Sequence, residues 1–136
     1  MSATAPRQKK KSPSPSKPLS LNQRLQRLSR KWIKKLKLQN FQKIDIRLYS
    51  KEQMDGSLGL AHWSPEYGQA QVLILDPMEN EDVTADEFEE FMEVTLVHEL
   101  LHIRLDGHKT MESVTANYDP AYEAAINILS DLLVKD

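Results

Sequence analysis

The chain has 136 residues, enough for one domain with a real core and too few for two ordinary domains. It has no cysteine, which excludes disulfides and thiolate metal sites, so any metal must be held by histidine and carboxylate side chains. No stretch approaches about 18 consecutive apolar residues, and the basic N-terminus lacks the apolar run of a secretory signal. We therefore expect a cytoplasmic protein with no membrane-spanning segment.

Charge is distributed very unevenly along the chain. Residues 1–40 carry 12 Lys and Arg and no acid, a charge of +12, whereas residues 41–136 carry 6 Lys and Arg against 20 acids, a charge of −14. The net charge of −2 is the sum of these two parts. Such a division suggests that the two regions have different tasks.

Residues 1–19 read as a disordered basic tail. This stretch has no hydrophobic periodicity, is rich in proline and Ser-Pro pairs, and cannot bury enough apolar surface to offset the entropy of ordering. A solubilising tail is the simplest interpretation. A weak contact with nucleic acid or a protein partner through the Lys9–Lys11 run is the alternative.

A basic amphipathic helix is predicted over residues 20–40, with Ser20 as its N-cap. Its apolar positions recur at helical spacing and are surrounded by arginine and lysine. These apolar positions are Leu21, Leu25, Leu28, Trp32 and Leu36. We expect the apolar stripe to pack on the core formed by residues 41–136, so that 20–136 is a single domain. A basic amphipathic helix can also lie on nucleic acid or on an anionic membrane, but this apolar stripe is short and interrupted by charge, which favours packing on the core.

Three strands are predicted next, at residues 43–50, 58–63 and 69–76. Alternating apolar and polar residues mark the first, and the Asp55-Gly56 turn signal precedes the second. The short Pro-containing and Gly-containing loop between the second and third strands favours an antiparallel pair.

Two helices complete the prediction. The first begins with a capping box of Thr84 and Glu87, runs to about Leu105 and is followed by Gly107. The second begins at Asp119-Pro120, an N-cap with proline at the first helical position, and runs to about Val134, with an expected apolar stripe of Tyr122, Ile126, Leu129 and Leu133. The fold class is therefore α+β.

The first of these helices contains His98-Glu99-Leu100-Leu101-His102. Residues i and i+4 lie on one helix face, so both imidazoles can reach the same zinc ion. Glu99 is rotated about 100° from His98, beside the metal, where a carboxylate can accept a proton from the attacking water. Because the surrounding positions are mostly apolar, these polar groups need partners, and a metal would satisfy both rings.

This stretch resembles the active-site helix of zincin-type metallopeptidases, and residues 41–134 resemble the small gluzincin-like metallopeptidases of phages and mobile elements. The resemblance rests on the five-residue motif, with "GLAHWSPEYGQAQVLIL" similar only in pattern to the sheet edge of that family. It implies a small zincin-like domain, in which a short, mostly antiparallel sheet packs on the motif helix and on a C-terminal helix. It also implies a glutamate ligand from that later helix.

Glu123, one turn into the last predicted helix, matches the ligand glutamate that the resemblance implies. His108 is the rival, because it follows His102 by six residues, the offset of the third histidine in the extended metzincin motif. That motif has a glycine where this chain has Leu105. Glu112 is a further carboxylate candidate. We take Glu123 as the expected third ligand.

The expected function is a zinc metallopeptidase, with Zn²⁺ held by His98, His102 and Glu123 and with Glu99 as the general base acting on a peptide or protein substrate. Residues 59–63 or 69–75 can hold an extended peptide by strand addition. Hydrolysis of a non-peptide amide uses the same groups. The alternative from another class is a zinc-stabilised, non-catalytic binding module with a basic N-terminal arm that contacts nucleic acid or a protein partner.

Overall fold

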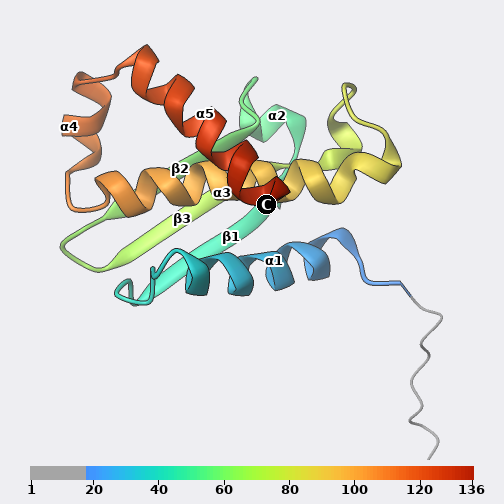
Figure 1. Cartoon of the computed structure of the whole chain (residues 1–136), viewed down its shortest axis with the longest axis horizontal. Coiled ribbons are helices and arrows are strands. Elements are labelled where there is room, and N and C mark those ends of the chain that lie inside the picture. The colour runs from blue at the N-terminus through green and yellow to red at the C-terminus, as the bar shows by residue number, and fades with distance from the viewer. Residues whose placement is uncertain (1–17) are drawn as a thin grey trace, which may run out of the picture.

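The computed structural model describes residues 18–136 and has an α+β fold (Figure 1). The predicted tail, residues 1–19, lies almost entirely outside the described residues. The long helix α3, Phe88–Asp106, runs through the centre, with α1, Leu21–Lys35, on one side of it and α5, Pro120–Lys135, on the other. Two short helices, α2 (Lys51–Met54) and α4 (Met111–Ala116), and two 3-10 turns, η2 (Pro77–Glu79) and η3 (Ala85–Glu87), connect these elements.

The sheet has three strands, β1 (Lys43–Tyr49), β2 (Gly59–Ser64) and β3 (Gln69–Leu75), in the order β1-β3-β2. The predicted antiparallel pairing of the second and third strands is confirmed, with Trp63 opposite Ala70. The expectation of a mostly antiparallel sheet is wrong for β1, which pairs in parallel with β3. After β1 the chain passes through α2 to form the far edge as β2, so β3 returns between them in the direction of β1.

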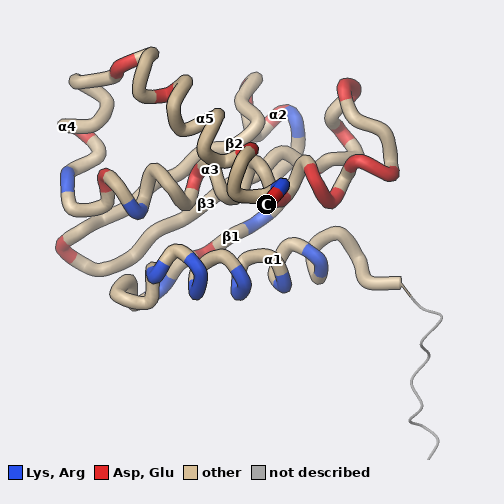
Figure 2. Tube along the Cα trace, viewed as in Figure 1, with Lys and Arg blue, Asp and Glu red and all other residues tan. Residues whose placement is uncertain are grey.

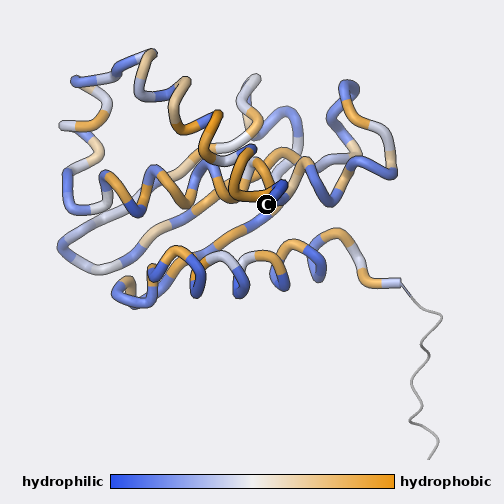
Figure 3. The backbone as a smooth tube through the Cα atoms, viewed as in Figure 1, coloured by the Kyte–Doolittle hydropathy of each residue, from blue (hydrophilic) through white to orange (hydrophobic). Residues whose placement is uncertain are grey.

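Helix α1 forms where its cap and periodicity predicted. Ser20 and Gln23 make a capping box. The backbone N–H of Gln23 donates to Ser20 Oγ at 3.1 Å, and the backbone N–H of Ser20 donates to Gln23 Oε1 at 2.8 Å. The predicted apolar stripe packs against α3 and β1, and Leu25, Leu28 and Trp32 are buried. Figure 3 shows the hydrophobic positions of α1 turned toward the rest of the molecule.

Helix α3 forms the core of the molecule. It starts at Phe88, later than predicted, because residues 85–87 form a 3-10 turn; the Thr84 amide donates to Glu87 Oε1 at 2.8 Å as the capping box requires. The largest buried side chains of α3 lie against the sheet and α1. They are Met92, Leu96, Val97, Leu100 and Ile103, each at most 1% exposed. Such complete burial on several sides makes α3 a rigid support for its polar residues.

Helix α5 begins as predicted, with Asp119 accepting a hydrogen bond from the Ala121 amide at 3.0 Å. Its packing corrects two expectations. The helix lies on α3 and not directly on the sheet, and the apolar stripe expected to continue through Leu129 and Leu133 is exposed at those two residues. Ile126 and Ser130 are buried instead. Within residues 18–136, no helix combines the length and apolar character needed to cross a bilayer.

Candidate metal centre

Three side chains from two helices converge between α3 and α5. His98 Nε2 lies 2.7 Å from Glu123 Oε2, and His102 Nε2 lies 3.0 Å from Glu123 Oε1. The two imidazole centroids are 4.9 Å apart. One ligand atom from each residue can be chosen so that all three lie within 4.8 Å of one another. The two histidines share one face of α3, and α5 brings the carboxylate to that face.

The local structure explains this convergence. Residues 98 and 102 are one turn apart on a helix, so their rings follow one another along its axis, with an angle of 67° between the ring planes. Glu123 lies in the first turn of α5, directly after the start set by Asp119 and Pro120. The rotation of α5 that turns Glu123 toward the histidines also brings Asn127, one turn further on, to the same side. Asn127 and Glu123 line one cavity together with His98. That rotation carries Leu129 away from the interface.

The donor set fits zinc. Two imidazole nitrogens and one carboxylate oxygen, with a position left for water, are the ligands of a common type of catalytic zinc site. Ligands at about 2.0–2.1 Å from a tetrahedral ion stand about 3.3 Å from one another. The contacts of 2.7 and 3.0 Å between the histidines and Glu123 are close to that separation. Small outward movements of these side chains would accommodate an ion.

The electrostatics of the site favour neutral imidazole. Burial lowers the pKa of His98, with the neighbouring Glu123 opposing that shift. A metal ligand must be the neutral imidazole, so the shift makes His98 available to a cation near neutral pH. The side chain of Glu123 keeps 31% of its surface exposed, so the site opens to solvent on the α5 side.

Glu99 lies beside the three convergent residues and not among them. Its Oε2 is 4.0 Å from His98 Nε2, and its residue exposure is only 8%. Burial raises the pKa of Glu99 to about 8, and the negative charge of Glu123 adds to the effect. In this position a carboxylate has a higher proton affinity than usual, which is a property of general bases.

Gly59 allows strand β2 to pass directly over Glu99. A Cβ atom at position 59 would lie 2.7 Å from Thr95 Cγ2 and 2.8 Å from Glu99 Oε2. Neither distance is compatible with a side chain in the present arrangement. The absence of a side chain at Gly59 therefore lets the sheet edge and the Glu99 carboxylate come close together.

A second set of polar residues stands behind His102. Asp106, only 7% exposed, has its Oδ2 3.9 Å from His102 Nδ1 and accepts a hydrogen bond from the Tyr122 hydroxyl at 2.8 Å. Lys109 Nζ lies 3.4 Å from the other carboxylate oxygen. Outer partners of this kind orient the imidazoles of metal sites. Asp106 faces the nitrogen of His102 that points away from Glu123.

Cavities lie on both sides of these residues. One, of about 350 Å³, is lined by the start of β2 and by residues of α3 and α5, including Gly59, Glu99 and Asn127. The other, of about 300 Å³, lies between α4 and the helix pair α3 and α5, and is lined by His102, Asp106, Tyr118 and Tyr122 among others. The convergent residues therefore lie between two cavities able to hold parts of an extended molecule.

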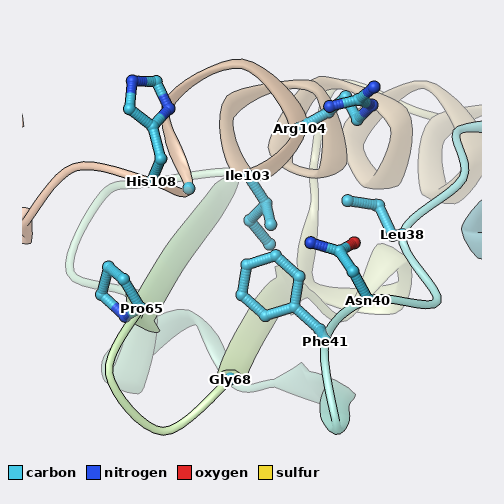
Figure 4. Close-up of a pocket in the computed structure, with 9 residues that line it drawn as sticks. Leu38, Asn40, Phe41, Pro65, Gly68, Ile103, Arg104 and His108 are labelled. Atoms are coloured by element: carbon cyan, nitrogen blue, oxygen red, sulfur yellow. The ribbon is translucent and has the colours of Figure 1, made fainter.

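The other sequence candidates lie elsewhere or act differently. His108 lines a separate pocket of about 410 Å³ with Asn40, Phe41 and Arg104, at the C-terminal end of α3 (Figure 4). Glu112 is exposed on α4. Of the two tyrosines that line the cavity beside His102, Tyr122 donates its hydroxyl to Asp106, whereas Tyr118 is 67% exposed.

His62 and Trp63, near the end of β2, do not converge with His98 and His102. His62 is exposed on β2. Trp63 is buried and donates to the Lys109 carbonyl at 2.8 Å.

Sequence reasoning missed Asp106, Asn127 and Gly59. Two of these had a local signal, because Asp106 follows His102 and Asn127 follows Glu123 by one helical turn. The role of Gly59 had no local signal, because it depends on how the sheet packs on α3.

Comparison with protein-family models, with curated proteins and with solved structures finds no match to this chain.

Proposed function

We propose that the protein is a zinc-dependent hydrolase of the zincin-like type that cleaves peptide bonds. The observation that carries the proposal is the convergence of His98, His102 and Glu123, with the buried carboxylate of Glu99 directly beside them. His98, His102 and Glu123 would hold the ion. When bound, zinc supplies a Lewis acid that acidifies water and polarises a carbonyl group.

The chain's own residues supply the remaining chemistry. Glu99, buried directly beside the three convergent residues, would act as a carboxylate that accepts the proton of the attacking water and then donates it to the leaving nitrogen. Asp106, held by the Tyr122 hydroxyl, faces His102 Nδ1 at 3.9 Å, and a small approach would let it accept that N–H and orient the ring. Asn127 lines the same cavity as Glu99, where its amide can donate to a substrate carbonyl.

Strand β2 supports an extended peptide as the substrate. It forms one edge of the sheet, so the backbone groups on its outer side are not used by another strand of residues 18–136. Gly59, at the start of β2, lies next to Glu99, so a peptide added to this edge would pass the general base. The cavities on the two sides of the histidines would receive side chains on either side of the cleaved bond.

The alternative, a zinc-stabilised module without catalysis, is less well supported. Structural zinc sites are usually closed by four protein ligands. Among residues 18–136, the group consists of three residues, and Glu123 is partly exposed. This leaves a position for water.

The test is metal content measured together with turnover. The full-length protein should contain about one zinc per chain by elemental analysis and should cleave members of a peptide library followed by mass spectrometry. Glu99→Gln should retain zinc and lose cleavage, whereas Glu90→Gln, at an exposed position of the same helix, should retain both. Zinc binding with no cleavage of any peptide by the unmodified chain would favour the non-catalytic module.

A further inference from the structure

Helix α1 presents a surface of a single charge sign. Six cationic residues and no acid occur within Leu21–Lys35. At about 100° per residue, all six fall within an arc of roughly 140° on the side opposite the buried stripe. They are Arg24, Arg27, Arg30, Lys31, Lys34 and Lys35. Figure 2 shows these residues along the outer side of α1, whereas many of the acids lie around the start of α3.

Few of these cations are neutralised by carboxylates of the described residues. Arg24 lies 3.7 Å from Glu89, and Lys31 lies 3.0 Å from Glu93. Within residues 18–136, the other four form no ion pair with a carboxylate. They are Arg27, Arg30, Lys34 and Lys35, and all four are exposed. Surfaces that only keep a protein soluble generally mix both charge signs, so a one-sign face indicates a polyanionic partner.

The use of the apolar side of α1 argues against a membrane surface. A helix that lies on a bilayer inserts its apolar face into the lipid. In α1 that face is occupied, because Leu25, Leu28 and Trp32 are buried against α3 and β1. The outward side therefore offers charge without an apolar anchor.

The lack of an exposed aromatic side chain on α1 argues against a single-stranded nucleic acid as the partner. Such strands are held by stacking of bases on aromatic side chains. The only aromatic residue of α1 is Trp32, which is 2% exposed and whose indole donates to Glu93 at 2.6 Å. Charge without stacking is the requirement for a duplex backbone, since counterion release from phosphates needs only cations.

We propose that the outer face of α1 is a docking surface for the phosphate backbone of double-stranded DNA. The helix has 15 residues and is about 22 Å long, so its cations can meet several successive phosphates. Half of them are arginines, whose planar guanidinium groups bind phosphate oxygens in pairs. B-form DNA also has a major groove wide enough to admit a helix, unlike the narrow major groove of an RNA duplex.

This surface and the candidate metal centre use opposite sides of α3. Helix α1 packs on one side of α3 and α5 on the other, with His98, His102 and Glu123 in the second interface (Figure 1). A duplex on α1 would leave the cavities beside the histidines open. If the proposed peptidase activity holds, this arrangement points to proteins bound on the same DNA as substrates; DNA docking itself does not rest on that activity.

The test is the salt dependence of binding to a 25-base-pair fluorescent duplex, measured by anisotropy in 50–300 mM KCl with the full-length protein. The informative variant is Arg27→Gln/Arg30→Gln/Lys34→Gln. Its matched control is Lys51→Gln/Arg104→Gln/Lys135→Gln, which removes the same charge from exposed positions on other elements. Thermal unfolding of both verifies that each variant is folded.

We expect the slope of log K against log [KCl] to become less steep by about 3 in the α1 variant, because each lost phosphate contact contributes about 0.9. Affinity at 50 mM KCl should fall at least tenfold, and the control should stay within twofold of the unmodified protein. Absence of salt-dependent binding by the full chain would overturn the proposal. DNA binding by the α1 variant as tight as that of the unmodified protein would also overturn it. In that case, loss of binding on deletion of residues 1–17 would assign the DNA contact to those residues.

Two further arms separate other partners and the metal. Stronger binding to an oligo-dT strand, to an RNA duplex or to phosphatidylserine vesicles than to the DNA duplex would also contradict the proposal. DNA binding should be unchanged by chelation and by Glu99→Gln. Failure of the DNA-docking proposal is therefore distinguishable from failure of the proposed hydrolase.

Discussion

Glu123 and His98, from different helices, meet at 2.7 Å between Oε2 and Nε2. The other oxygen of the same carboxylate lies 3.0 Å from His102, so Glu123 contacts both imidazoles of the motif helix. A buried helix could satisfy its histidines with separate backbone or carboxylate partners. Here a single carboxylate faces a ring nitrogen of each histidine. Two imidazoles and one carboxylate directed at a common point are the arrangement of three ligands around a metal ion.

Glu123→Ala should weaken zinc binding by orders of magnitude, because only two protein ligands would remain. The helix should still form and pack, since Ile126 stays buried against α3. His108→Ala should leave zinc affinity nearly unchanged, because His108 lines a different pocket. Competition with a chromogenic chelator measures both. Loss of zinc in the His108 variant with retention in the Glu123 variant would show that the third ligand has been misassigned.

Removal of metal should lower the melting temperature. An ion that binds only the folded state stabilises it by about 2.7 kcal/mol when its free concentration is 100 times the Kd. Unfolding scans with zinc and with EDTA should therefore differ for the unmodified chain. The same scans on Glu123→Ala should coincide, and a persistent difference in that variant would mean that zinc is bound elsewhere.

Gly59→Ala should reduce hydrolysis far more than it reduces zinc binding. The new Cβ would overlap Thr95 Cγ2 at 2.7 Å and Glu99 Oε2 at 2.8 Å, so the Glu99 carboxylate must move, whereas neither of these atoms belongs to His98 or His102. Turnover and zinc content of the variant, with Thr95→Ser as the control, measure this. Unchanged turnover in Gly59→Ala would remove Glu99 from its assigned role or show that β2 shifts freely.

Asp106→Asn should weaken zinc affinity about 10–100-fold, the usual effect of losing a partner that orients a ligand imidazole. The carboxylate faces His102 Nδ1 at 3.9 Å and is held by the Tyr122 hydroxyl. Lys109→Gln should have little effect, because the Lys109 side chain is half exposed and exposed ion pairs contribute little. If the two variants bind zinc equally well, Asp106 serves the fold and not the histidine.

Trp32→Ala should destabilise the protein by about 3–5 kcal/mol, the usual cost of truncating a buried aromatic residue. Trp32 is 2% exposed and its indole donates to Glu93. Urea denaturation should show a lower midpoint for Trp32→Ala and a nearly unchanged one for Lys34→Ala on the exposed side. A midpoint close to that of the unmodified chain would mean that α1 is not part of the cooperative core.

Local features could be predicted from the sequence because they depend on neighbours in the chain. The cap at Ser20, the start of α5 at Asp119-Pro120 and the antiparallel pair β2 and β3 follow from hydrogen bonds and turns within a few residues. The shared helix face of His98 and His102 follows from the pitch of an α-helix alone. The segregation of charge and the amphipathic character of α1 likewise follow from the order of the residues alone.

Tertiary packing decided what those local rules leave open. The parallel pairing of β1 with β3 depends on the path of the chain through α2, which no strand signal contains. The exposure of Leu129, the approach of Glu123 to both histidines and the need for Gly59 all depend on how α5 and β2 are rotated against α3. These rotations come from the combined burial of many side chains across the core, so no short stretch of sequence determines them.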